Sequence, residues 1–153
     1  MSAPIYLDHN ATTPVAPEAL DAMLPFFREH YGNPSSNHAF GWGADEAVKI
    51  SRKRIGKALG CDPRGLTFTS GASEAISLAL RGAGFTYGGR KHRIVTVQTE
   101  HKAVLETISS LEHDGFEVVR LPVDASGLID LDQLRDAVNE KTLMVSVMWG
   151  NNE

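Results

Sequence analysis

The sequence predicts an α/β fold in which a mainly parallel sheet is flanked by helices. Three runs rich in β-branched and apolar residues have the character of strands, at residues 92–97, 116–121 and 142–148. Helical patterns lie between them, at residues 103–113 and 130–138. Strands that alternate with helices imply right-handed βαβ units, and therefore parallel strands.

The first part of the chain is predicted to be helical. Pro17 suits the first turn of a helix, and Pro25 predicts a kink or a break further along it. The longest helical pattern covers residues 37–59 and is followed by Gly60, which suits a C-terminal cap. Residues 31–36 are predicted to form the loop between these helices.

The stretch from residue 67 to residue 80 has the local pattern of a phosphate site. Residues 67–69 have strand character, Ser70 and Gly71 form a turn pair, and a helix is expected from Ala72 to about residues 82–84. A helix N-terminus offers unpaired N–H groups and the positive end of the helix dipole, both of which favour a phosphate.

The alternative for this stretch is an ordinary helix cap. Ser70 would then cap the helix, with Ser73 or Glu74 in its first turn. The serine hydroxyls could equally donate to phosphate oxygens, so this stretch alone does not decide between the two.

The topology predicts where a ligand would bind. Ligands of parallel sheets lie beyond the carboxyl ends of the strands. Three segments follow such ends, at residues 70–73, 99–101 and 150–153, so we expect them to converge on one site. The last strand, residues 142–148, is nearly continuously apolar, which predicts burial on both faces.

Composition excludes several classes of protein. The chain has 153 residues, enough for one sizeable core, and its net charge of -4 argues against a nucleic-acid partner. No apolar run is long enough to predict a membrane span. The one cysteine, Cys61, excludes an internal disulfide framework and indicates a reducing, cytoplasmic location. The six histidines match no metal-ligand spacing, so no metal is expected.

Five segments together resemble the N-terminal part of a cysteine desulfurase of the NifS/IscS type, within the class V aminotransferases. They are residues 7–14 (Leu-Asp-His-Asn-Ala-Thr-Thr-Pro), 32–36 (Gly-Asn-Pro-Ser-Ser), 68–74 (Phe-Thr-Ser-Gly-Ala-Ser-Glu), 99–104 (Thr-Glu-His-Lys-Ala-Val) and 145–153 (Val-Ser-Val-Met-Trp-Gly-Asn-Asn-Glu). Each motif alone is weak, but the five follow one another with fitting spacing along the whole chain.

The resemblance implies a fold-type I enzyme that uses pyridoxal 5'-phosphate (PLP), usually as a homodimer. Such an enzyme takes sulfur from L-cysteine and gives L-alanine and an enzyme persulfide, which a sulfur-acceptor or iron–sulfur scaffold protein receives. Residues 1–16 would belong to the small domain, and residues 17–153 to an incomplete large, PLP-binding domain. The chain also stops directly after a core strand, so we expect it to be truncated.

The resemblance also assigns site residues. Ala72, through its backbone, and Ser73 would hold the cofactor phosphate; His101 would stack on the pyridine ring and move protons, and Asn152 would lie beside the ring and the substrate carboxylate. An imidazole and an amide suit these tasks. Taken alone, His101 fits an exposed residue at a helix start, and Asn152 fits a turn after a strand.

In the family, the Schiff-base Lys, the acidic partner of the pyridine nitrogen and the persulfide Cys all lie further along the chain. Lys102 belongs to the ring-stacking segment, and Cys61 matches no persulfide loop, so neither is assigned these roles. The chain by itself is therefore expected to be inactive. Two alternatives stay open: a non-catalytic protein that pairs with a full-length relative, and another class V PLP enzyme such as a selenocysteine lyase.

Overall fold

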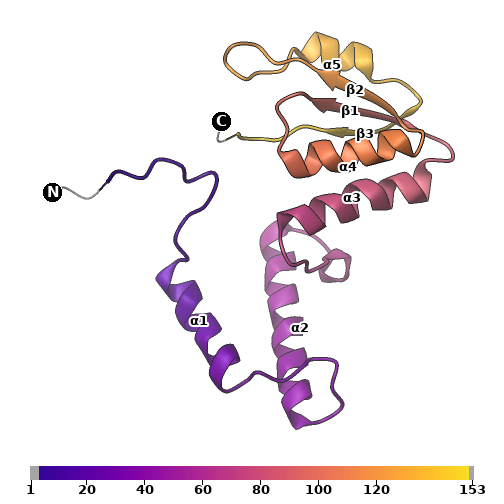
Figure 1. The fold of residues 1–153 in the computed structure, drawn as a ribbon. Coiled ribbons are helices and arrows are strands. Elements are labelled where there is room, and N and C mark those ends of the chain that lie inside the picture. Colours follow the sequence, from indigo (N-terminus) through magenta and orange to yellow (C-terminus); the bar gives the residue numbers. More distant parts are fainter. Residues whose placement is uncertain (1–3, 152–153) are drawn as a thin grey trace. The chain divides into compact units, whose positions relative to one another are not determined.

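A computed structural model of the protein describes residues 4–151, in two compact units (Figure 1). One unit comprises residues 12–68. The other joins the N-terminal segment, residues 4–11, to residues 69–151. We describe each unit by itself and call the second one the sheet unit.

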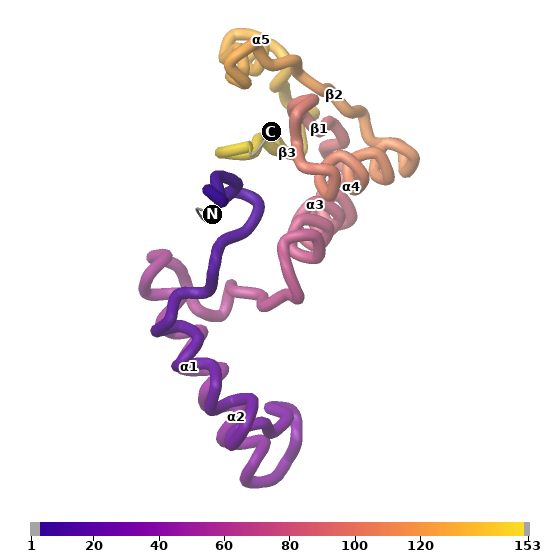
Figure 2. The backbone as a smooth tube through the Cα atoms, turned by 60° about the vertical axis from the view of Figure 1, so that its left-hand side comes forward, coloured from indigo at the N-terminus to yellow at the C-terminus, as the bar shows by residue number. Residues whose placement is uncertain are grey.

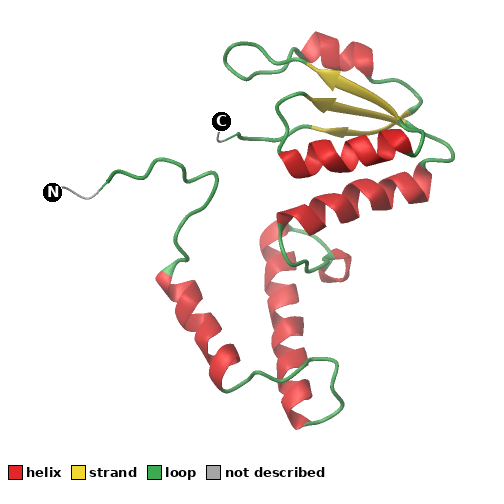
Figure 3. Cartoon of the chain, in the orientation of Figure 1, coloured by secondary structure: helices red, strands yellow, loops and turns green. Residues whose placement is uncertain are grey.

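The sheet unit is built on three parallel strands, drawn as arrows in Figure 3. They are β1 (Arg93–Val97), β2 (Glu117–Leu121) and β3 (Thr142–Ser146), in the order β2-β1-β3. Val95 on the central strand lies opposite Val119 on one side and Val145 on the other. The predicted parallel α/β arrangement is therefore confirmed.

Helices cover both faces of this sheet (Figure 1). On one face, α3 (Ala72–Tyr87) and α4 (Lys102–His113) pack on β1 through Leu80, Ile94, Val104, Ile108 and Leu111. On the other face, Leu134 of α5 (Leu131–Ala137) packs against Val95, Val97 and Leu121. Ile94, Val95, Ile108 and Leu111 have no solvent exposure, so this unit has a true core.

Local signals set the ends of these helices. The Asp130 carboxylate accepts from the N–H groups of Asp132 and Gln133 at distances of 2.8 and 3.2 Å, which caps α5 as the sequence predicts. Gly115, with a φ of 96°, follows α4 in the left-handed region that glycine favours.

The prediction that the last strand is buried on both faces is wrong. Among the described strands β3 is an edge strand, and Val145 is 45% exposed. The strand also ends at Ser146, two residues before the end of the apolar run. The apolar run correctly gave the strand type, but periodicity does not tell which strands lie at an edge.

The predicted end of α3 near residues 82–84 is also wrong, because the helix continues to Tyr87. A side chain at Gly84 would approach Leu111 to 3.2 Å and Phe116 to 3.3 Å. This glycine therefore permits close packing of α3 on α4 and does not stop the helix. Residues 67–69 are likewise not a strand, since they pair with none of the described strands.

The unit of residues 12–68 contains α1 (Pro17–Arg28), α2 (Ala39–Leu59) and a short 3₁₀ turn, η1 (Pro63–Gly65). Gly60 follows α2 with a φ of 67°, as predicted. Pro25 lies inside α1 without breaking it, so the predicted break is absent. Within this unit only Gly41, Ala44 and Gly56 are buried.

Gly41 explains how the loop before α2 packs. A side chain there would lie 2.1 Å from the Ser36 carbonyl oxygen and 2.8 Å from that of Asn33. The loop thus rests directly on the first turn of α2, backbone on backbone. No helix within residues 4–151 is long and apolar enough to cross a membrane.

Candidate cofactor site

A cavity of about 610 Å³ lies in the sheet unit, beyond the carboxyl ends of β1 and β3. Its walls come from four separate segments of the chain: Asn10 and Ala11; Ala72 and Ile76; Glu100, His101 and Val104; Ser146, Val147 and Met148. The start of α3 and the segment after β1 therefore meet at one cavity, as the sequence predicts. Of the third predicted segment, residues 150–153, the described residues Gly150 and Asn151 do not line it, and Ser146 to Met148 line it instead.

Helix α3 begins at this cavity with Ala72. The residue before it, Gly71, is the N-cap, and α3 receives no capping hydrogen bond from a side chain. Ser73 is exposed in the first turn. The first N–H groups of α3, together with the helix dipole, therefore form a suitable place for an anion.

Ser70 is engaged elsewhere, so the alternative in which it caps α3 is wrong. Its backbone N–H and its hydroxyl donate to Glu74 Oε2 at 2.7 and 2.6 Å. These hydrogen bonds lower the pKa of Glu74. Glu74 therefore holds the turn before α3 in place. The first N–H groups of α3 receive no capping hydrogen bond from a side chain, so an anion could accept hydrogen bonds from them.

His101 stands at the mouth of the cavity as the N-cap of α4. Its Nδ1 accepts from the N–H of Ala103 at 3.1 Å, and the ring is exposed. Because Nδ1 accepts this bond, Nε2 carries the proton of the neutral imidazole. His101 therefore both caps α4 and lines the cavity.

Glu100 is one of several members of this site that the sequence did not single out. Its side chain is buried, with 7% of the residue exposed, and it lines the cavity beside His101. Burial raises the pKa of its carboxyl, while the N–H groups of Met148 and His101 act in the opposite direction. Its position directly before the predicted site residue His101 was a signal in the sequence that Glu100 belongs to the site. The sequence does not show, however, that its side chain is buried.

Two asparagines join the ends of the sheet unit. Asn151 Nδ2 donates to the Thr99 carbonyl oxygen at 2.9 Å, and Asn10 Nδ2 donates to the Asn151 carbonyl oxygen at 3.3 Å. The N-terminal segment and the segment after β3 consequently lie side by side (Figure 2). The predicted site residue Asn152 lies outside the described residues.

The lysine and cysteine set aside by the sequence argument are both at the surface. Lys102 Nζ lies 3.6 Å from Glu106 Oε1, and its side chain is 82% exposed. Cys61 is a free, exposed thiol in the other unit. Residues 4–151 contain no group of three His, Cys, Asp or Glu side chains that could hold a metal ion.

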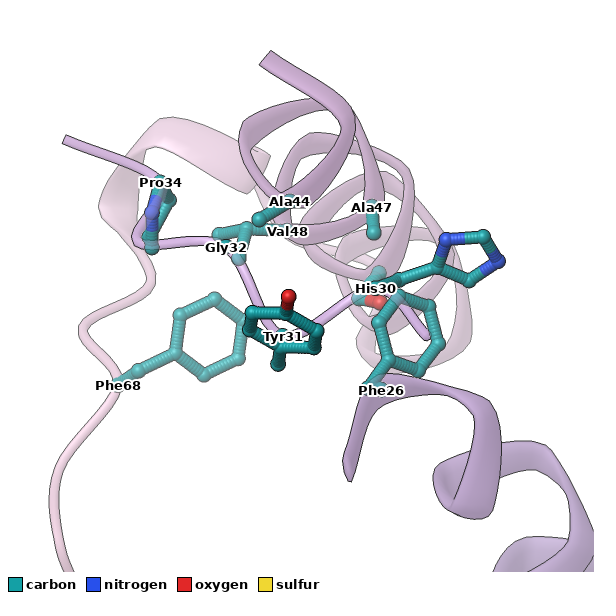
Figure 4. Close-up of a pocket in the computed structure, with 10 residues that line it drawn as sticks. Phe26, His30, Tyr31, Gly32, Pro34, Ala44, Ala47, Val48 and Phe68 are labelled. Carbon is teal, nitrogen blue, oxygen red and sulfur yellow. The ribbon is translucent and has the colours of Figure 1, made fainter. Parts of the chain in front are cut away.

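A second cavity, of about 420 Å³, lies within residues 12–68 and is shown in Figure 4. The rings of Phe26, Tyr31 and Phe68 and the side chain of Val48 line it. His30, Tyr31 and Ser51 are its polar side chains. None of the predicted cofactor residues that the structure describes, Ala72, Ser73 and His101, lies in it.

This chain belongs to the aminotransferase class-V family, whose model matches residues 5–153. It is 48% identical to a cysteine desulfurase IscS of Neisseria meningitidis and spans 38% of that protein. It is 48% identical to a mitochondrial cysteine desulfurase of Drosophila melanogaster, and 50% identical to a probable one of Schizosaccharomyces pombe. It covers 33% and 30% of their lengths, and they match 98% of this chain.

Solved structures agree with this assignment. A NifS-like protein superposes with a TM-score of 0.90 at 43% identity, over 97% of this chain and 41% of that one. A structure described as SspA in complex with cysteine gives a TM-score of 0.86 at 38% identity, over 97% and 43%. The chain therefore spans well under half of the proteins that it matches.

Proteins of this family depend on PLP, and the cavity suits that cofactor. The uncapped start of α3 suits a phosphate, and His101 lies in the cavity wall. Ser73 lies in the first turn of α3 but is not among the residues that line the cavity. The cavity is also large enough for a small cofactor.

Proposed function

We propose that the complete protein is a PLP-dependent cysteine desulfurase that transfers the sulfur of L-cysteine to an enzyme cysteine. One observation carries this proposal: residues far apart in the sequence, Ala72, His101 and Ser146, line one cavity at the carboxyl ends of the strands. The identity of 48–50% to cysteine desulfurases supports the reaction type.

The phosphate of PLP would lie at the start of α3. The backbone N–H of Ala72 and the hydroxyl of Ser73 would donate to its oxygens, and the helix dipole would favour its charge.

His101 would orient the cofactor ring and move a proton. Its ring is fixed through Nδ1, which accepts from Ala103. That leaves Nε2 as the atom that gives or receives a proton during the reaction. Asn152, at the end of the segment after β3, would orient the ring and the substrate carboxylate by donating and accepting hydrogen bonds.

When bound, PLP supplies an electron sink that weakens bonds at the substrate carbon atoms. The overall reaction balances without an external oxidant. L-cysteine and an enzyme thiol give L-alanine and an enzyme persulfide: the carbon–sulfur bond breaks, a sulfur–sulfur bond forms, and a proton takes the place of sulfur on carbon.

The test uses the protein as its gene encodes it, purified with PLP. Alanine and protein-bound persulfide should form in equal amounts from L-cysteine, and a persulfide acceptor should restart turnover. Formation of neither product would reject the proposal. The 153-residue chain alone is the matched control, and we expect it to be inactive because the family's Schiff-base Lys and persulfide Cys lie outside it.

We also propose that the complete protein is a homodimer. Large apolar side chains lie exposed within residues 12–68, among them Phe27, Tyr31 and Trp42 at 71, 68 and 60%. An exposed apolar surface of this kind suits an interface. Sedimentation of the complete protein should show one species of twice the chain mass, and a monomer would count against this part.

The remaining assignments are part of the same proposal. Residues 1–16 would belong to a small domain and residues 17–153 to the large domain. The persulfide would serve iron–sulfur cluster assembly through a scaffold protein, in the cytoplasm. The single cysteine supports a reducing compartment, but two of the relatives are mitochondrial. Fractionation of the source cells with an antibody would test the location.

A further inference from the structure

Glu100 is a buried carboxyl that the proposed roles leave unused. Only 7% of the residue is exposed, and Oε1 makes no hydrogen bond with any described residue. A buried carboxylate oxygen without a partner works against folding, so such groups normally have a functional reason. Its place in the chain is directly after Thr99 and before His101, beyond the carboxyl end of β1.

Glu100 lies in the walls of two cavities of the sheet unit. The first is the candidate cofactor cavity. The second, of about 560 Å³, is lined by Gln98, Lys102 and Asn151 among others. Glu100 and His101 are the residues that line both. The carboxyl therefore lies where the segment after β1 meets the segment after β3.

These two segments contact each other at two points. Glu100, His101 and Met148 line the same cavity, and the backbone N–H groups of Met148 and His101 act to lower the pKa of the Glu100 carboxyl. Asn151 Nδ2 donates to the Thr99 carbonyl oxygen at 2.9 Å. Asn151 therefore also joins the two segments, through a hydrogen bond of its side-chain amide.

We propose that Glu100 is a positioning residue of the cofactor cleft, which holds the segment after β3 against His101 and so sets the space for the cofactor ring. This inference rests on the proposed function. His101 lines the cavity from one of these segments and Val147 and Met148 from the other, so a shift of one segment against the other would change the fit. The carboxylate is well suited to the task, because it can accept from both backbone N–H groups at once.

The contact itself is tested without any cofactor. Amide hydrogen exchange is measured in the complete protein freed of PLP, for Glu100→Ala, Glu100→Gln and Glu106→Ala. Glu106 lies in the same region, but its side chain is 68% exposed, so it is the matched control. We expect the Met148 amide to exchange about tenfold faster in Glu100→Ala. Glu100→Gln keeps one acceptor oxygen and should show a smaller increase.

The effect on the cleft is tested by PLP binding. The Kd for PLP should rise about tenfold in Glu100→Ala and stay unchanged in Glu106→Ala. If Glu100→Ala fails to fold, the exchange at Met148 and the Kd for PLP are both measured on Glu100→Gln. Unchanged exchange at Met148, or an equal increase at the core residue Val95, would overturn the proposal, since the latter would indicate a general loss of stability.

The two proposals can fail separately. A wild-type protein that binds no PLP would reject the proposed function, while the exchange at Met148 would still test the contact of Glu100. Normal PLP binding in both Glu100 variants would overturn the positioning role and leave the proposed function intact.

Discussion

The sheet unit and the unit of residues 12–68 bury their apolar side chains to very different degrees. In the sheet unit, Ile94, Val95, Ile108 and Leu111 have no solvent exposure. In residues 12–68 the buried positions are two glycines and Ala44, while Phe27 and Leu59 are 71 and 67% exposed. Both units contain large apolar side chains, and the units differ in how far these side chains are buried.

The difference follows from connectivity. A parallel strand must be followed by a crossover that returns over the sheet, so α4 and α5 cover the two faces of their own sheet, and α3 packs on the face of α4. Helices α1 and α2 have no such sheet within residues 12–68. We therefore expect the sheet unit to govern stability and the other unit to supply surface for contacts in the complete protein.

The largest expected effect is a difference between two leucines. Leu111→Ala should lower the free energy of unfolding by about 2–5 kcal/mol, because Leu111 is fully buried between α4 and the sheet. The same change at the exposed Leu59 should cost less than about 0.5 kcal/mol. Urea unfolding followed by circular dichroism measures both. Equal losses would contradict the contrast between the units.

Glycines test whether residues 12–68 contain any close packing. Gly41→Ala should lower the stability of α2 by about 1–3 kcal/mol, since its side chain would overlap the Ser36 carbonyl oxygen. Gly43 is the control in the same helix, because a side chain there meets nothing within 4 Å. Gly43→Ala should raise the stability by up to about 1 kcal/mol. Thermal melting distinguishes the two, and a shared direction would reject the packing argument.

Cofactor binding should act on the sheet unit. In the complete protein, Ser73→Ala should weaken PLP binding about tenfold, because it removes one donor to the phosphate. Ser73→Thr keeps the hydroxyl and serves as the control. PLP should raise the melting temperature of the wild type and of Ser73→Thr more than that of Ser73→Ala. An equal rise in all three would exclude Ser73 from the phosphate site.

The smallest expected effect is the pH dependence due to Glu100. Burial raises its pKa in the folded state, so the folded state keeps this proton over a pH range in which the unfolded state has lost it. The free energy of unfolding therefore falls as pH rises from the unfolded pKa to the folded one. Glu100→Gln should remove this fall, and the gain over wild type should appear only above that window.

Glu112 gives a control of opposite sign. The hydrogen bond from Arg120 lowers the pKa of Glu112, so this glutamate stabilises the fold above its unfolded pKa and loses that effect as pH falls through the folded pKa. Glu112→Gln should therefore lower stability at neutral pH and match wild type in acid. Urea midpoints measured from pH 4 to pH 8 test both glutamates. If the two variants changed stability in the same direction relative to wild type as pH rises, the opposite pKa shifts of Glu100 and Glu112 would be contradicted.

Several elements could be predicted from the sequence because their signals are local. The βαβ pattern, the cap by Asp130, the cap by Gly60 and the start of α3 at Ala72 all depend on a few neighbouring residues. The start of α3 and the segment after β1 could also be placed at the cofactor cavity, since in a parallel sheet all carboxyl ends lie at one edge. The contributions of residues 10–11 and 146–148 were not predicted. The errors were at positions where the outcome depends on distant residues.

The sequence by itself therefore determined the α/β class, the family and two segments of the candidate site, the start of α3 and the segment after β1. Only the tertiary structure decided that Gly84 lies inside a helix, that β3 lies at the edge of the described sheet, and that Glu100 is buried beside His101. The physical reason is range: caps, turns and periodicity are set within a few residues. Burial and strand order are set by contacts between segments that are tens of residues apart.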